Sequence, residues 1–248
     1  MPNFTPLKNY TLRLIDSMIT AHGLQGPFLD AGCGRGDVAR HLAQRGWEGL
    51  AVDFSPEAIQ IAQDMLRDYP IQTQTVDIMD VSGNFRTIIS STVIEHVQDD
   101  AALLRHFHRL LTNSTYNGGW LIISMPTNPD REWRWDDNFY GHYRRYTKEQ
   151  VEQLLKECGF QMLEFCDYTF PVFWAMRRAY TRLFPAKKPS SAVPEKNTAE
   201  SSMKSAWNMG ILSRFVEILP VWSVVYSLQK PFRHGKRGFE AVAIAQAL

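Results

Sequence analysis

The sequence predicts an α/β protein in which a mainly parallel sheet is covered by helices on both faces. Three observations predict it. Between about residues 28 and 125, short apolar runs rich in β-branched residues alternate with helical patterns. The first of these runs leads directly into a glycine-rich turn. The chain has 248 residues, of which 44% are apolar and 21% charged, so it can bury a sizeable core.

Seven segments have the length and composition of β-strands. The first five are separated by helical patterns, which favours parallel pairing, whereas the last two follow a change of organisation. The predicted strands are residues 27–31, 48–53, 71–77, 85–92, 118–126, 160–168 and 237–248.

The predicted helices have recognisable ends. Ser55 is placed to cap a helix whose first residue is Pro56. Thr147 stands three residues before Gln150, which is capping-box spacing, and Gly159 follows as a stop. The predicted helices cover residues 37–46, 55–69, 99–111 and 147–159, and an amphipathic pattern at residues 7–19 predicts one more.

The cysteines and the N-terminus suggest a cytoplasmic protein. The chain has three cysteines, Cys33, Cys158 and Cys166, and none is in a CxxC pair. The first twenty residues lack the basic start and unbroken apolar core of a signal peptide. The sequence contains no spacing typical of metal ligands, so we expect no metal.

The stretch FLDAGCGRGD, residues 28–37, places glycines at positions 32, 34 and 36. Glycines after a strand let a ligand approach the backbone closely, and the helix that follows offers free amide groups. The dinucleotide-binding fingerprint would need its third glycine at Asp37. A nicotinamide-dependent dehydrogenase is therefore disfavoured.

Two acidic residues limit which ligand the glycine turn can bind. Asp53 ends the second predicted strand about twenty residues later, where a carboxylate accepts hydrogen bonds from ribose hydroxyls. Asp30 would repel a pyrophosphate beside the glycine turn but would attract an ammonium group. S-adenosylmethionine carries both a ribose and an amine.

These residues resemble the class I S-adenosylmethionine-dependent methyltransferases, of the methyltransferase 11 and 12 groups. LDAGCGRGD matches the first motif of that family, an acidic residue followed by GxGxG. AVDFSPEAIQIAQ is similar to the second motif, IISSTVIEHVQDD to the fourth-strand motif, and GHYRRYTKEQVEQLLKECGF to the segment beyond the fifth strand. The likeness covers residues 28–168. It implies a Rossmann-like fold, an enzyme of class EC 2.1.1, and S-adenosylhomocysteine as product.

The resemblance also implies a set of cofactor contacts. Each predicted contact lies at or just after the end of one of the first four strands. Asp30 would hold the amine, Gly32, Gly34 and Gly36 the methionine chain, Asp53 the ribose, Phe54 the adenine ring, Asp77 and Ile78 the adenine amino group and its neighbour, and Ser91 the methionine part from below.

The acceptor side is predicted from two segments. His96 follows the fourth strand, where it is either a general base or a brace for the fold. The aromatic and charged loop at residues 130–146 is either a lid over the acceptor, through His142, Tyr143 and Arg144, or packing beneath a later segment. We take His96 and Tyr143 as the catalytic candidates.

About seventy residues separate the last two predicted strands, which is too long for a plain loop. Residues 169–235 carry ten basic and three acidic side chains, whereas the rest of the chain carries 17 basic and 23 acidic ones. We predict a methyltransferase core at residues 1–168, a helical cap insert at residues 169–235 and a final core strand at residues 236–248.

The insert has two interpretations. Arg214, Glu217 and Pro220 interrupt its apolar run at residues 209–229, so a membrane span is not expected. The run would either close an acceptor pocket or lie on an anionic membrane surface. No nucleic-acid recognition module is visible, so nucleic acid is not expected as a partner.

The predicted activity is methyl transfer to an oxygen or nitrogen of a small, partly hydrophobic acceptor, such as a secondary metabolite. The alternatives are a lipid or lipid-linked acceptor at a membrane surface, and a non-catalytic scaffold that keeps the cofactor fold. The location is expected to be cytoplasmic, with peripheral membrane contact as the alternative. The sequence leaves the oligomeric state open.

Overall fold

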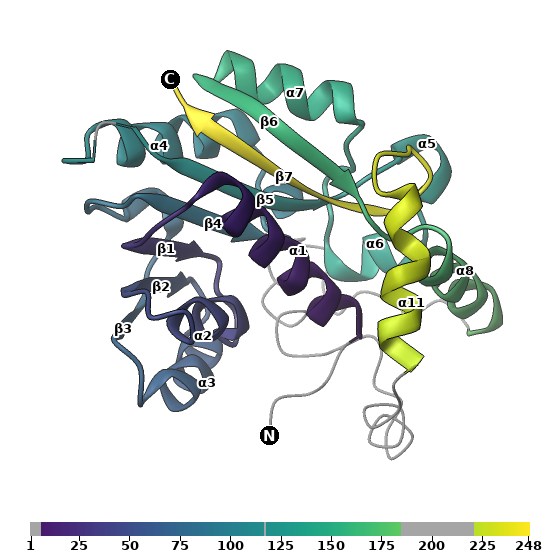
Figure 1. The fold of residues 1–248 in the computed structure, drawn as a ribbon, viewed down its shortest axis with the longest axis horizontal. Coiled ribbons are helices and arrows are strands. Elements are labelled where there is room, and N and C mark those ends of the chain that lie inside the picture. The colour runs from purple at the N-terminus through teal and green to yellow at the C-terminus, as the bar shows by residue number, and fades with distance from the viewer. Residues whose placement is uncertain (1–5, 117, 185–220) are drawn as a thin grey trace.

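A computed structural model describes residues 6–116, 118–184 and 221–248, and its centre is a seven-stranded sheet (Figure 1). Across the sheet the strand order is β3-β2-β1-β4-β5-β7-β6. Strands β1 to β5 pair in parallel, whereas β7 is antiparallel to β5 and β6. The strands are β1 Phe28–Ala31, β2 Gly49–Asp53, β3 Ile71–Thr75, β4 Thr87–Ser91, β5 Trp120–Pro126, β6 Phe160–Asp167 and β7 Glu240–Ala247.

Helices cover both faces of the sheet, as the sequence predicts. The buried side chains form two clusters, one on each face. Helices α1, α2 and α3 contribute to the first cluster, and α4 and α7 to the second. Their bounds are α1 Pro6–His22, α2 Asp37–Ala43, α3 Pro56–Leu66, α4 Asp100–Thr112 and α7 Lys148–Glu157.

The predicted helix starts are confirmed. The Oγ atom of Ser55 accepts the backbone N–H of Ala58 at 3.2 Å, and Pro56 is the first residue of α3. At the start of α7 the backbone N–H of Gln150 donates to Thr147 Oγ1 at 3.2 Å, and the backbone N–H of Thr147 donates to Gln150 Oε1 at 2.8 Å. Both caps satisfy amide groups that would otherwise lack partners.

Short helices follow the carboxyl ends of several strands and form one edge of the molecule. They are the 3₁₀ helices η1 (Ile78–Asp80) and η2 (Ile94–His96), and the α-helices α5 (Pro129–Glu132) and α6 (Trp135–Tyr140).

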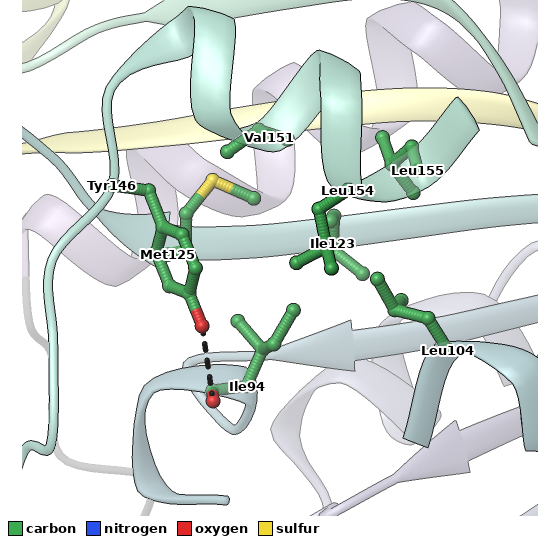
Figure 2. Close-up of a pocket in the computed structure, with 8 residues that line it drawn as sticks. All are labelled: Ile94, Leu104, Ile123, Met125, Tyr146, Val151, Leu154 and Leu155. Carbon is green, nitrogen blue, oxygen red and sulfur yellow. Dashed lines mark hydrogen bonds between the residues drawn. The ribbon is translucent and has the colours of Figure 1, made fainter. Parts of the chain in front are cut away.

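Tyr146, just before α7, anchors η2. Its hydroxyl donates to Asp100 Oδ2 at 2.9 Å. The same hydroxyl lies 3.3 Å from the Ile94 carbonyl oxygen, as Figure 2 shows. The surrounding side chains are apolar, and the gap between them has no room for water. This dry packing fixes η2 against α7.

The two described ends of the insert are helical. They are α8 (Val172–Leu183) and α11 (Val221–Gln229), with the 3₁₀ helix η3 (Lys230–Phe232) after α11. The Tyr226 ring of α11 stacks on Tyr10 of α1 with centroids 4.8 Å apart, and Trp222 stacks on Phe173 of α8 at 6.0 Å. Residues 185–220, with the polar stretch and most of the apolar run, lie outside the described residues. The division into core and cap stays a prediction.

None of the described helices is long and apolar enough to span a membrane. The three cysteines are free and buried.

Candidate active site

The glycine turn after β1 combines two packing glycines with one that faces open space. All three have positive φ, which is +78° at Gly32, +52° at Gly34 and +83° at Gly36. A Cβ on Gly32 would lie 2.4 Å from Val93, and one on Gly36 would lie 3.2 Å from α3 side chains. A Cβ on Gly34 would meet nothing within 4 Å. Gly34 therefore leaves a space in which a ligand can reach the backbone.

Asp53, at the end of β2, connects this turn to the next helix. Its Oδ2 accepts the N–H of Gly34 and its Oδ1 accepts the N–H of Ser55, each at 2.9 Å. Burial raises the pKa of Asp53. A carboxylate has about four acceptor positions, so ribose hydroxyls could still donate to it. The side chain of the next residue, Phe54, is 49% exposed and so is accessible to a ligand.

Asp30 lies beneath the glycine turn. Its side chain is 1% exposed, and its Oδ2 accepts the N–H of Ala39 in α2 at 3.0 Å. Burial raises the pKa of Asp30 to about 7. The carboxylate therefore has a structural partner, and its contact with a ligand amine stays a prediction.

The other predicted cofactor residues lie at the same edge, because the carboxyl ends of parallel strands meet there. The exposed Asp77 accepts the N–H of Met79 at 2.9 Å and so begins η1, where Ile78 is half-buried. Ser91 ends β4, and its Oγ lies 2.8 Å from Ser124 Oγ in β5. The fold thus brings the predicted set to one edge, and their individual contacts stay predictions.

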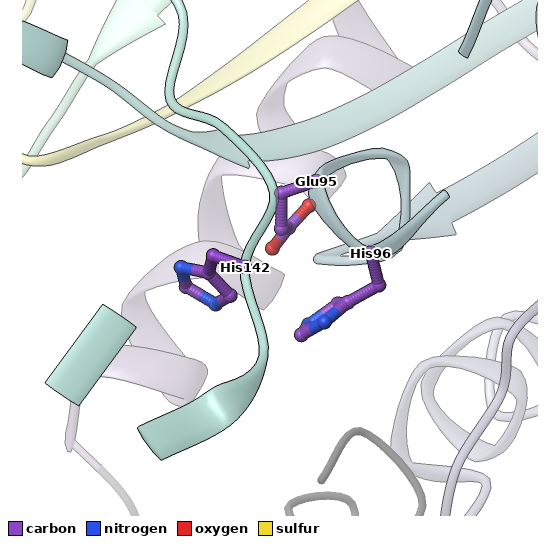
Figure 3. A group of neighbouring side chains, drawn as sticks. All are labelled: Glu95, His96 and His142. Carbon is purple, nitrogen blue, oxygen red and sulfur yellow. The ribbon is translucent and has the colours of Figure 1, made fainter. Parts of the chain in front are cut away.

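Next to this edge, three potential ligand groups converge (Figure 3). Glu95 and His96 belong to η2, and His142 follows α6. One nitrogen or oxygen atom from each of them lies within 4.8 Å of the others. The rings of His96 and His142 meet edge to face, with centroids 4.8 Å apart.

The Glu95 carboxylate is 0% exposed. Apart from its own backbone N–H, it has no hydrogen-bond partner among the described residues. The neighbouring positive charge is Arg145, whose Nε donates to Asp137 at 2.7 Å and whose Nη1 donates to two backbone carbonyls. Burial raises the pKa of Glu95 to about 8.

His142 is oriented by a carboxylate. Its Nδ1 lies 2.8 Å from Oδ1 of Asp137. Although burial opposes ionisation, the hydrogen bond from His142 and the charges of Arg145 and Arg177 hold the pKa of Asp137 below its usual value. An ionised carboxylate only accepts hydrogen bonds, so Nδ1 carries the proton and Nε2 of the neutral ring has a lone pair.

Of the two predicted catalytic residues, His96 belongs to this cluster and Tyr143 directly follows His142. Burial, and to a smaller extent the neighbouring His142, lower the pKa of His96 to about 3. A hydrogen bond with the Gly141 backbone raises the pKa, but by less. The N–H of Tyr143 donates to the Glu95 carbonyl at 2.8 Å, which joins the loop after α6 to η2. The structure thus brings the segments of His96 and Tyr143 together, and their catalytic roles stay predictions.

Sequence reasoning missed the buried charges that support the cluster. Arg177 of α8 pairs with Asp136 and Asp137, which are 41 and 40 residues earlier in the chain. In the sequence these residues look like ordinary charges in a polar loop, and no local signal pairs them. Trp135 also donates through Nε1 to the Thr181 carbonyl at 3.1 Å. Part of the aromatic loop therefore packs against the insert, while His142 faces η2.

A basic and aromatic pocket lies beyond α5, with a volume of about 370 Å³. Within it, Arg178 stacks 4.1 Å from the centre of the Trp174 ring and pairs with Glu132 at 2.6 Å. The lining residues are Asn128, Arg131, Glu132, Phe170, Trp174, Arg178, Lys236 and Arg237.

The strand order, the antiparallel β7 and the glycine turn after β1 define the class I methyltransferase fold. The family model described as a methyltransferase domain matches residues 7–164, so the chain belongs to that family. The family and the fold predicted from the sequence are both confirmed.

Two relatives with assigned activities match parts of the chain. A 2-heptyl-1-hydroxyquinolin-4(1H)-one methyltransferase of Mycobacteroides abscessus is 38% identical over 76 residues, which are 28% of this chain and 34% of that protein. A ubiquinone biosynthesis O-methyltransferase of Xanthomonas oryzae pv. oryzae is 30% identical over 102 residues, which are 39% of this chain and 41% of that protein. The matched region therefore spans less than half of each relative.

Two solved structures share the fold over most of the chain. Magnesium protoporphyrin IX methyltransferase from Synechocystis PCC 6803, solved with bound S-adenosylhomocysteine, has a TM-score of 0.55 at 15% identity, covering 96% of this chain and 82% of that one. The cyclase SpnF has a TM-score of 0.57 at 20% identity, covering 95% and 81%. Because one neighbour is a cyclase, the fold alone does not assign the chemistry.

Proposed function

We propose that the protein is an S-adenosylmethionine-dependent methyltransferase that methylates an oxygen or nitrogen of a small, partly hydrophobic acceptor. One observation carries the proposal: Gly34 opens onto empty space and donates its N–H to the Asp53 carboxylate at 2.9 Å, and the residue after Asp53 is the exposed Phe54. An amino-acid chain, a ribose and an adenine need these three surfaces. The names of the two relatives, which act on a hydroxyquinolone and in ubiquinone synthesis, support a small cyclic acceptor.

The residues at the strand ends fit the cofactor. Asp53 would accept hydrogen bonds from the ribose, Phe54 would stack on the adenine, and the backbone at Gly34 would contact the methionine chain. When bound, S-adenosylmethionine supplies a methyl group already activated by the positive sulfur. The chain mainly has to align the acceptor and exclude water.

His96 and Tyr143 remain the proposed acceptor-side residues. With its pKa lowered to about 3, His96 is neutral at physiological pH and a weak general base. Its place beside Glu95 and His142 therefore supports a role as a neutral donor or ligand, more than as a proton acceptor.

Calorimetric titration tests the cofactor assignment. The purified chain is titrated with S-adenosylmethionine, with S-adenosylhomocysteine and with NADH. We expect the first two to bind with one site per chain and NADH to show no heat. Binding of NADH alone would replace the proposal with a dehydrogenase. Binding of none would support the scaffold alternative.

A lipid-linked or otherwise anionic acceptor is the second candidate. The basic and aromatic pocket favours it, because Arg131, Arg178, Lys236 and Arg237 outnumber the single acid Glu132. Flotation with anionic and with neutral liposomes tests it. We expect binding to the anionic vesicles only, and at least fivefold less binding by Arg131→Ala/Arg237→Ala. Equal recovery with both vesicle types, or none with either, would reject the membrane candidate.

A further inference from the structure

We propose that Glu95, His96 and His142 bind one divalent first-row transition-metal ion, which holds the acceptor oxygen beside the cofactor edge. The ion site is argued from the geometry of these side chains alone. The role toward the acceptor rests on the proposed function.

The three side chains converge closely enough for one ion. Their ligand atoms all lie within 4.8 Å of one another, and Figure 3 shows the carboxylate and the two rings facing a common centre. Nitrogen and oxygen ligands bind zinc at about 2.0–2.2 Å, so two ligands of one tetrahedral ion lie about 3.3–3.6 Å apart, roughly 1 Å closer than the widest separation here. Small side-chain rotations would bring the three atoms into range.

Among the described residues, no cationic side chain is hydrogen-bonded to the buried carboxyl group of Glu95. A carboxylate with no exposure and no donor beyond its own backbone N–H is strongly destabilised when it is ionised. The guanidinium of Arg145 is directed at Asp137 and at the carbonyls of Thr127 and Phe239. A cation between Glu95 and the imidazoles would compensate the charge.

His142 is already arranged as a metal ligand. Its Nδ1 donates to Asp137 at 2.8 Å, which leaves the Nε2 lone pair for an ion. Metal-binding histidines usually donate their second ring N–H to a carboxylate or carbonyl in this way. Arg145 and Arg177 in turn hold Asp137, so the ring orientation is supported over several contacts.

The donor set indicates the class of metal. Two imidazoles and one carboxylate suit zinc or iron(II), whereas magnesium and calcium prefer oxygen ligands throughout. Three protein ligands leave at least one coordination position for another group. In a methyltransferase, that position would suit a hydroxyl of the acceptor.

A cation at this place would assist methylation of oxygen. A hydroxyl bound to a divalent ion loses its proton more readily. The proton passes to solvent, the acceptor oxygen forms a bond to the methyl carbon, and the carbon–sulfur bond breaks with its electron pair staying on sulfur. No oxidant or reductant is needed.

Zinc binding by the chelator-treated, untagged chain tests the site directly, without cofactor or acceptor. We expect about one equivalent of zinc per chain by calorimetry and elemental analysis, and a visible absorption spectrum when cobalt(II) is added instead. Glu95→Gln and His96→Asn should each weaken zinc binding at least tenfold. His234→Gln, which removes an exposed imidazole, is the matched control and should bind zinc as the parent does.

No bound zinc, or equal zinc affinity in the parent, Glu95→Gln and His96→Asn, would overturn the site. Circular dichroism identifies a variant that fails to fold, and His142→Asn then replaces it. Titrating the metal-free chain with S-adenosylhomocysteine separates the two proposals. Cofactor binding without zinc binding removes only the metal, and zinc binding without cofactor binding removes the methyltransferase assignment.

Discussion

Arg177 of α8 forms a two-point ion pair with Asp136 of α6. Its Nε lies 2.9 Å from Asp136 Oδ2, and its Nη2 lies 2.7 Å from Asp136 Oδ1. The same guanidinium contacts Asp137 at 2.9 Å and the Glu132 carbonyl at 3.0 Å. Some of the basic excess of the insert is therefore used inside the protein, where it attaches α8 to the segment that carries His142.

Arg177→Ala should lower the free energy of unfolding by roughly 3–5 kcal/mol, because it leaves the buried Asp136 without its arginine partner and removes one of the cations that pair with Asp137. Urea unfolding followed by circular dichroism measures this. Arg182→Ala removes an exposed arginine from the same helix and should change the stability by less than about 0.5 kcal/mol. Equal stability of the two variants would show that the Arg177 pairs do not hold the insert.

Gly34→Ala should weaken S-adenosylhomocysteine binding at least tenfold, because the new methyl group fills the space that faces the ligand. The positive φ should cost about 1–2 kcal/mol of stability. Gly46→Ala, which also has a positive φ and open surroundings, controls for that strain and should keep full affinity. Unchanged affinity of Gly34→Ala in calorimetry would place the cofactor elsewhere.

Gly32→Ala should instead act on the fold. Its Cβ would lie 2.4 Å from Val93, so steric overlap adds to the backbone strain. We expect Gly32→Ala to lower the free energy of unfolding by about 1–3 kcal/mol more than Gly34→Ala does. Thermal unfolding of the two variants side by side tests the difference, and similar midpoints would contradict it.

Phe54→Ala should weaken S-adenosylhomocysteine binding about tenfold or more, because stacking on a base is typically worth about 1–3 kcal/mol. The ring is 49% exposed, so its removal should leave the stability nearly unchanged. Phe184→Ala, which removes a ring that is 54% exposed on the insert, should bind the ligand as the parent does. If both variants keep the parent affinity, Phe54 does not contact the adenine.

The stability of the protein should fall as the pH rises from about 4 to 7, in part because of Asp30. Burial raises the pKa of Asp30 to about 7, and the charges of Asp53 and Asp37 add to this rise. The hydrogen bond from the Ala39 N–H and the charge of Lys8 lower the pKa, but by less. An acid with a raised pKa binds its proton more tightly in the folded state, so folding is favoured while the group is protonated and this advantage is lost on ionisation.

Asp30→Asn keeps an acceptor for the Ala39 N–H and removes the titration. Over that pH range the free energy of unfolding should fall by up to about 4 kcal/mol more in the parent than in this variant. This is the energy that corresponds to a pKa raised by about three units. Urea unfolding at several pH values measures the difference. Parallel stability curves for the two proteins would show that Asp30 ionises normally.

The segments that carry local signals were predictable. Ser55, Pro56 and the pair Thr147 and Gln150 cap their helices as predicted, because capping depends on residues only a few positions apart. The alternating pattern likewise identified all seven strands. The parallel arrangement then required the glycine turn, Asp53 and Ser91 to meet at one edge, whatever their spacing in the chain.

The sequence by itself determined the family, the mainly parallel seven-stranded sheet, and the edge at which the predicted cofactor residues gather. Only the tertiary structure decided which charges are buried together. The approach of His142 to Glu95 and His96, and of Arg177 to Asp136, joins segments about forty or more residues apart. Such pairs leave no periodic pattern, because burial and partner choice are set by how η2, α6 and α8 pack and not by neighbours along the chain.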